Sequence, residues 1–171
     1  MDEEKVVIDE VASDTYDASD RPFDFIEEGG KTALICETDP SIKDKVVSVL
    51  ADMDYHITEP ESARDALKKM RFHVYDMVVL NEDFDTDDSD ANNVLKYLEY
   101  LPMGTRRNIF VALVSNRFRT MDNMAAFNKS VNTIINVKNI DDVGTIIKRG
   151  ITDNESFYHV FKESLKKMGR T

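Results

Sequence analysis

Five short strand-like runs alternate along this chain with longer segments whose apolar residues recur at helical spacing. An unbroken apolar run rich in β-branched residues, such as Met77–Leu80, is typical of a strand buried on both faces of a parallel sheet. The runs are Ala33–Cys36, His56–Thr58, Tyr75–Leu80, Ile109–Val114 and Thr133–Val137. This alternation predicts an α/β fold, a (βα)5 three-layer sandwich whose parallel five-stranded sheet has the order 2-1-3-4-5.

Capping residues mark where two of the helical segments begin. Asp39 followed by Pro40 combines an N-cap acceptor with a proline at the first helical position, and Ser62 is a suitable N-cap for a helix from Ala63. The predicted helices cover Pro40–Asp54, Ala63–Arg71, Val94–Leu101, Met121–Phe127 and a segment that begins at Val143. Because Gly150 falls inside the last pattern, residues 141–168 fit either one long helix or two.

Acidic residues are concentrated at the beginning of the chain. Residues 1–30 contain eleven acids against two bases, so this stretch carries −9 of the formal net charge of −11. It lacks sustained periodicity, which is typical of a mobile segment. We therefore predict an acidic, mobile N-terminal arm at 1–30, a folded domain at 31–150, and a C-terminal helix at 151–171 that packs on or extends the last helix of the domain.

The composition argues against several classes of partner. An acidic chain is a poor ligand for nucleic acid, and the sequence has neither an apolar run long enough to span a membrane nor a basic helix that would lie on one. The start Met1–Glu4 does not resemble a signal peptide. The single cysteine, Cys36, lies in an apolar run and fits a core position in a reducing cytoplasm, so we expect a cytoplasmic protein.

Polar residues follow the predicted strands at the points where the strands end. Because parallel strands end at the same edge of a sheet, which we call the carboxyl edge, these residues are expected to lie together there. They are Glu37 and Thr38, Asn81, Ser115 and Lys138. Six carboxylates follow Asn81 within the nine residues Glu82–Asp90, which we call the acidic loop.

Four segments in this order resemble the receiver domains of bacterial two-component response regulators, the CheY-like domains of flavodoxin-like fold. They are Leu34–Pro40, Tyr75–Asn81, Val114–Ser115 and Asn136–Lys138, and the resemblance covers about residues 32–150. It implies transfer of a phosphoryl group to an aspartate that ends the third strand, beside a magnesium ion held partly by two acids after the first strand. It also implies that Ser115 and Lys138 stand where receivers bind the phosphoryl oxygens.

The sequence departs from the receiver pattern at five positions around this site. Asn81 stands at the phospho-acceptor aspartate and Thr38 at one of the two metal-binding acids. Asn116 replaces a small residue, Asn139 a proline, and Ile135 the aromatic residue of the switch. A carboxamide is a poor nucleophile and adds no charge to a metal site. These departures predict a degenerate pseudo-receiver, not an enzyme and without a cofactor, that signals by phosphorylation-independent protein–protein interaction.

Two alternatives keep a role for the acidic loop. The chain would be a working, atypical receiver if Asp83 or Asp85 accepted the phosphoryl group with Mg²⁺. The loop would be a Ca²⁺ site if the acids Asp83, Asp85 and Asp87 acted as in an EF-hand, although Asp88 and Val94 stand where that motif has its glycine and its closing glutamate. A solvated acidic loop is the simpler interpretation.

A third hypothesis for the loop is an internal ion pair, which we call the charge lock. An acid of Glu82–Asp85 (Glu82, Asp83 or Asp85) would pair with Lys138 or Arg117 and stand in for the phosphoryl group; Arg119 belongs to the same edge. The alternative is that these charges are separate and solvated, each contributing under about 1 kcal/mol.

A further class of function is an enzyme or nucleotide-binding protein with the same fold. The stretch Gly29–Thr32 resembles the end of a P-loop, but it precedes a strand and lacks the first glycine of the motif. The three histidines, His56, His73 and His159, are scattered without metal-ligand spacing. We therefore prefer an interaction module to an enzyme.

The expected partner is a signalling protein or a second copy of the chain. The surface that receivers commonly use corresponds to the helix Met121–Phe127, the strand Thr133–Val137 and the helix that begins at Val143. An apolar stripe over Phe157–Met168 is expected to pack in the core, with a dimer or partner surface as the alternative.

Overall fold

A computed structural model describes residues 30–170 of the chain. The strands are β1 (Lys31–Cys36), β2 (Tyr55–Thr58), β3 (Met77–Asn81), β4 (Phe110–Ser115) and β5 (Thr133–Asn136). The helices are α2 (Pro40–Asp52), α3 (Ala63–Phe72), η2 (Ser89–Ala91), α4 (Asn93–Tyr100), α5 (Met103–Arg106), α6 (Asn123–Asn128), η3 (Val137–Asp142) and α7 (Val143–Lys167). The arm predicted at 1–30 lies outside the described residues, apart from Gly30.

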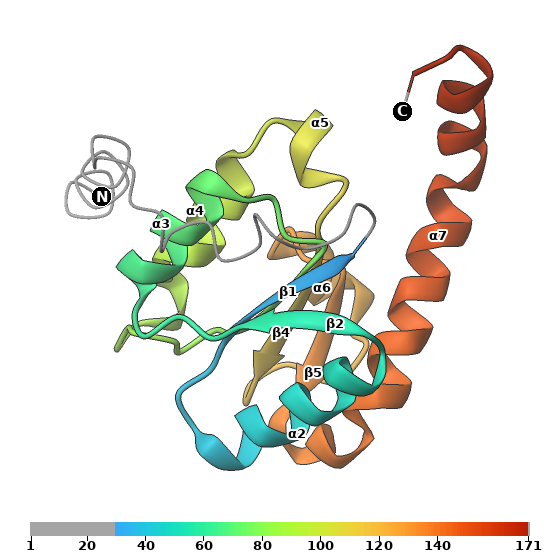
Figure 1. Cartoon of the computed structure of the whole chain (residues 1–171). Coiled ribbons are helices and arrows are strands. Elements are labelled where there is room, and N and C mark those ends of the chain that lie inside the picture. Colours follow the sequence, from blue (N-terminus) through green and yellow to red (C-terminus); the bar gives the residue numbers. More distant parts are fainter. Residues whose placement is uncertain (1–29, 171) are drawn as a thin grey trace.

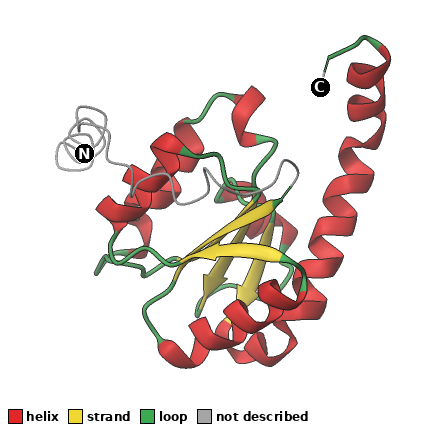
Figure 2. Ribbon diagram, viewed as in Figure 1, coloured by secondary structure: helices red, strands yellow, loops and turns green. Residues whose placement is uncertain are grey.

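The five strands form one parallel sheet in the order β2-β1-β3-β4-β5, as the alternation predicted. In this register Ala33, Met77 and Phe110 lie level with one another on β1, β3 and β4. Figure 2 shows the strands between two layers of helices. The fold is the CheY-like, flavodoxin-like sandwich, with the ends of β1, β3 and β4 meeting at the carboxyl edge.

Each face of the sheet has its own apolar core. Val78 and Leu80 pack toward α3, α4 and α6, whereas Met77 and Val79 pack toward α2 and α7. All four side chains are fully buried. Burial on both faces explains why the central strands have continuous apolar runs instead of alternation.

The predicted helix starts are confirmed by their hydrogen bonds. The Asp39 carboxylate accepts from the Ser41 backbone N–H at 2.9 Å at the start of α2. The Ser62 hydroxyl accepts from the Asp65 backbone N–H at 3.1 Å at the start of α3. These bonds satisfy N–H groups that have no partner within the helix.

Helix α7 is a single helix of 25 residues, so Gly150 does not interrupt it. A Cβ atom on Gly150 would lie 2.8 Å from Cζ of Phe110. The residue is therefore small because the helix passes directly over the ring of Phe110, and not because the chain turns there.

The expectation that the Phe157–Met168 stripe packs in the core is wrong. Phe157, Val160 and Met168 are 79%, 73% and 67% exposed. At 1.5 Å per residue, α7 is about 38 Å long, whereas a strand of six residues spans roughly 20 Å. The second half of α7 therefore extends past the sheet, as Figure 1 shows. No helix within residues 30–170 is long and apolar enough to cross a membrane.

Candidate functional site

The first contact at the carboxyl edge joins Glu37 to Asn81. The amide nitrogen of Asn81 donates to Oε2 of Glu37 at 2.7 Å. The other oxygen, Oε1, accepts from the backbone N–H groups of Thr38 and Asp39 at 2.9 and 3.0 Å. Glu37 is 5% exposed, and both of its carboxylate oxygens accept hydrogen bonds from the protein. The Asn81 side chain is also engaged at its oxygen, which accepts from the backbone N–H of Asp83 at 2.9 Å.

The second contact places a buried carboxylate against Ser115. Glu82 is 1% exposed, and its Oε1 accepts from the Ser115 hydroxyl at 2.6 Å. Arg117 donates from Nε to both Glu82 oxygens at 3.2 Å and from Nη2 to Oε2 at 2.9 Å. This two-pronged contact is the geometry in which a guanidinium binds a carboxylate most firmly. It compensates the burial of a charge that would otherwise be costly.

A third layer of charges extends the pair toward α6. Asp90 accepts from Arg117 Nη2 at 3.1 Å and from Lys129 Nζ at 2.8 Å. The Phe118 ring lies beneath both cations, 4.8 Å from the Arg117 guanidinium and 5.9 Å from the Lys129 amine. Hydrogen bonds from Lys129 and Arg117 lower the pKa of the Asp90 carboxyl, and the hydrogen bonds that Arg117 donates to Glu82 and Asp90 raise the pKa of Arg117.

Asn92 fixes the acidic loop to this arrangement. Its amide donates to the Glu82 carbonyl at 2.9 Å, and its side-chain oxygen accepts from the Leu95 backbone N–H at 3.0 Å as the N-cap of α4. Phe84, 2% exposed, anchors the loop in the core. The carbonyl of Glu82 is thereby tied to the start of a helix, which limits its freedom to rotate.

The two other loop acids proposed for the site point elsewhere. Asp83 accepts from the Ser89 hydroxyl at 2.5 Å within the loop, and Asp85 accepts from the Ala63 backbone N–H at 2.9 Å at the start of α3. Asp85 adopts a positive φ of 51°. The structure therefore pairs Glu82, and neither Asp83 nor Asp85, with Arg117.

Lys138 lies outside this network. Strand β5 ends at Asn136, whose side-chain oxygen accepts from the Lys138 backbone N–H at 2.9 Å and turns the chain into η3. The Lys138 side chain is exposed, and Asn139 accepts from the Thr120 hydroxyl at 2.7 Å. Among the described residues, the acidic loop pairs with Arg117, and the exposed Lys138 side chain forms no ion pair with it.

The remaining residues that the sequence indicated for the site differ in their exposure to solvent. Thr38, Asn116 and Arg119 are exposed, while Ile135 is fully buried among the side chains that face α2 and α7. An aliphatic residue packed in that core has no aromatic ring to rotate toward the surface. Within residues 30–170, no group of three His, Cys, Asp or Glu side chains is arranged to hold a metal ion.

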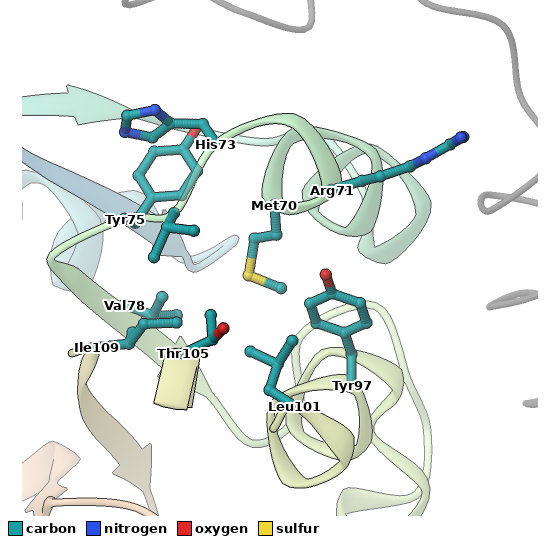
Figure 3. Close-up of a pocket in the computed structure, with 10 residues that line it drawn as sticks. Met70, Arg71, His73, Tyr75, Val78, Tyr97, Leu101, Thr105 and Ile109 are labelled. Atoms are coloured by element: carbon teal, nitrogen blue, oxygen red, sulfur yellow. The ribbon is translucent and has the colours of Figure 1, made fainter. Parts of the chain in front are cut away.

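A small cavity lies at the opposite edge of the sheet. It measures about 180 Å³ and is enclosed mainly by side chains of α3, α4 and the segments that precede β3 and β4. Figure 3 shows Met70, Tyr97 and Leu101 lining it. It does not adjoin Glu82 or Asn81, so it takes no part in this site.

Sequence reasoning missed three residues of the network. Asn92 stands two positions before the predicted helix Val94–Leu101 and is a residue type that favours the N-cap. Asp90 was one of several equivalent loop acids. Lys129, 39 residues away from Asp90 along the chain, had no signal at all. Long-range ion pairs follow from the fold and not from local spacing.

Solved structures of receiver domains share this architecture. A CheY-like response regulator receiver domain protein from Methanospirillum hungatei is 17% identical, with a TM-score of 0.55 over 74% of this chain and 97% of that one. The chemotaxis response regulator CheY4 of Vibrio cholerae is 12% identical, with a TM-score of 0.55 over 70% of this chain and 98% of that one. A LuxR-family DNA-binding response regulator from Staphylococcus aureus is 17% identical, with a TM-score of 0.53 over 70% and 98%. At these identities the likeness shows the fold alone.

No protein-family model matches the sequence, and no curated protein sequence matches it.

Proposed function

We propose that this chain is a receiver-like signalling module that accepts no phosphoryl group and acts by binding a protein partner. The observation that carries the proposal is the contact between Ser115 and Glu82. In the receivers that the fold resembles, a hydroxyl at the end of the fourth strand binds a phosphoryl oxygen. Here the Ser115 hydroxyl donates to a carboxylate of the chain itself at 2.6 Å.

The residue at the expected phospho-acceptor position supports the same proposal. Asn81 offers a carboxamide, which is a much weaker nucleophile than a carboxylate. Both ends of this amide are already hydrogen-bonded, one to Glu37 and one to the backbone of Asp83. A reacting phosphoryl group would have to break these contacts and would meet no carboxylate at Asn81.

The charge balance explains how Glu82 can replace a bound phosphoryl group. A carboxylate buried to 1% exposure needs a cation, and Arg117 supplies it at 2.9 Å. Through Asp90 and Lys129 the same network reaches the C-terminal end of α6. In this proposal, the internal carboxylate holds the carboxyl edge and α6 in one fixed arrangement.

The α6–β5–α7 side carries the exposed apolar residues that a partner would bury. On α6, Met124 and Phe127 are 69% and 79% exposed, and Phe157 on α7 is 79% exposed. Exposed large apolar side chains that lie on one side are frequent in protein interfaces. The partner is another signalling protein or a second copy of this chain.

The chemical half of the proposal is tested with a small-molecule phosphodonor. The full chain is incubated with Mg²⁺ and acetyl phosphate, and its intact mass is measured at neutral pH. We expect no added phosphoryl group. A stable gain of one phosphoryl group, located to Asp83 or Asp85 by peptide mapping, would establish an atypical receiver instead.

The binding half of the proposal is tested with a matched pair of variants. Phe127 on α6 and Tyr100 on α4 are equally exposed at 79%. Self-association is measured by sedimentation velocity, and retained partners are compared after capture from the native cytoplasm. We expect Phe127→Ser to lose binding and Tyr100→Ser to keep it. Equal binding by both variants would exclude this face.

A further inference from the structure

A basic and aromatic groove lies between α5 and the second half of α7. One wall is the segment Gly104–Asn108, and the other is formed by Tyr158, Phe161 and Leu165. The guanidinium of Arg107 lies 4.6 Å above the Phe161 ring and joins the two walls. The volume of the groove is about 380 Å³. The first half of α7 packs on the sheet, and the groove lies on its second half.

The charges around this groove have one sign. Its lining includes the bases Arg107, Lys162, Lys166 and Arg170 and no acidic side chain. The nearest acid of this helical turn, Glu163, lies 3.6 Å from His159 and is not part of the lining. Such a surface favours a segment that combines carboxylates with aromatic side chains.

We infer that this groove binds the chain's own segment Phe23–Glu28. That segment reads Phe-Asp-Phe-Ile-Glu-Glu, with three large apolar side chains and three acids. Its apolar side chains can pack against the aromatic walls of the groove, and its acids supply the negative charge that the groove lacks. A second copy of the chain is a poorer occupant, because the same face of two copies would bring the lysines of α7 together.

The topology places this segment within reach. Backbone hydrogen bonds from Asp76 to Thr32 and from Phe110 to Asp76 align the starts of β1, β3 and β4. In this register Ala33 on β1 is level with Phe110 on β4, two strands away, and neighbouring strands are about 4.8 Å apart. The lateral separation is therefore about 10 Å. Figure 1 shows the start of β1, α5 and the second half of α7 toward the same end of the sheet.

The length of the connection is sufficient for this path. Phe25 precedes Lys31 by six residues, which span up to roughly 20 Å when extended. Gly29 and Gly30 stand between Glu28 and Lys31 and permit a sharp turn at the strand start. The acidic segment thus needs no rearrangement of the described residues to reach the groove.

Photo-cross-linking of the full chain tests this inference. Benzoylphenylalanine is placed at position 25, and an equal mixture of isotopically labelled and unlabelled chains is irradiated and mapped by mass spectrometry. We expect cross-links within one chain to residues 104–108 or 158–170. Cross-links to other surfaces, or only between two chains, would overturn the inference.

A charge-reversal pair keeps this test specific. Lys166→Glu with Arg170→Glu is expected to lose most of the cross-link. The matched control, Lys148→Glu with Arg149→Glu, changes the same charge on the exposed side of α7 outside the groove and is expected to keep it. Equal cross-linking in both variants contradicts binding by the basic groove.

Hydrogen exchange supplies an independent readout without the photo-reactive group. In the full chain, Phe25→Ser is expected to increase amide exchange in residues 158–168. The control Val7→Ser, in the same acidic stretch, is expected to leave it unchanged. No difference between Phe25→Ser and the natural chain would also overturn the inference.

Discussion

The carboxylate of Glu82 is held by the guanidinium of Arg117 at 2.9 Å, although only one of the two side chains is buried. Glu82 is 1% exposed, whereas the Arg117 side chain is 37% exposed. The pair therefore connects an interior anion to the surface. Because Arg117 is the exposed member of the pair, it can be replaced without changing the apolar core, and the resulting change in stability measures the energetic role of the pair.

Removal of Arg117 is expected to destabilise the fold. Breaking a fully buried pair costs about 3–5 kcal/mol, and the exposure of Arg117 reduces the expected loss for Arg117→Ala to roughly 2–3 kcal/mol. Urea denaturation followed by circular dichroism measures it. Lys138→Ala and Arg119→Ala, which remove exposed bases from the same edge, are expected to stay within about 0.5 kcal/mol. A similar loss in all three variants would mean that Arg117 has no special relationship with Glu82.

Replacement of Asn81 by aspartate is expected to destabilise the protein and to make it responsive to Mg²⁺. The variant loses the 2.7 Å donor to Glu37 and brings two carboxylates together, which is expected to cost roughly 2–3 kcal/mol. A divalent cation between paired carboxylates offsets part of this repulsion. Melting temperatures with and without Mg²⁺ measure both effects, with Asn123→Asp at the exposed first residue of α6 as the control. An Asn81→Asp variant as stable as the natural chain would contradict the importance of this contact.

The contribution of Asp90 is expected to depend on pH. Its pKa is lowered by Lys129 and Arg117, so the stabilisation is present above the ordinary aspartate pKa of about 3.9 and is lost as the pH falls through the lower folded value. Asp90→Asn should therefore melt below the natural chain at pH 7, and the two melting temperatures should converge in acid. Asp87→Asn, in the same loop, serves as the control. A difference that persists unchanged in acid would assign it to something other than the Asp90 charge.

A methyl group at Gly150 is expected to destabilise α7 despite its higher helix propensity. Alanine gains about 1 kcal/mol over glycine within a helix, whereas overpacking against Phe110 costs about 1–3 kcal/mol. We expect a net loss of roughly 1 kcal/mol, and a smaller loss when Gly150→Ala is made in a Phe110→Leu background. Gly104→Ala, with no atom within 4 Å of the new methyl, is the control. A stabilised Gly150→Ala would show that the helix can move away from the ring.

Most of the fold could be predicted from the local pattern of apolar and polar residues. Every strand lies within two residues of its predicted ends. For the central strands the reason is that burial on both faces requires a continuous apolar run, whereas the edge strand β2 has no fully buried residue. Gly150 was ambiguous for a physical reason. A glycine that ends a helix and a glycine that lets a helix approach a ring look the same in sequence, and only the position of Phe110 distinguishes them.

The site was accessible only in part. The ends of β1, β3 and β4 correctly indicated Glu37, Asn81 and Ser115 as residues of one sheet edge. The choice of cation was not decided by sequence, because Lys138 and Arg117 both follow strands that end there. The chain turns at Asn136, where the side chain accepts a hydrogen bond from the Lys138 backbone N–H, and spacing along the sequence does not reveal this turn.

The carboxylate of Glu82 is joined to its backbone by carbon–carbon bonds, and that has a consequence for timing. A phosphoryl group on an aspartate is removed by water, which returns a conventional receiver to rest. An internal glutamate does not hydrolyse. If the module works as proposed, no hydrolysis step ends its signal, and the duration of that signal is governed by synthesis and turnover of the protein.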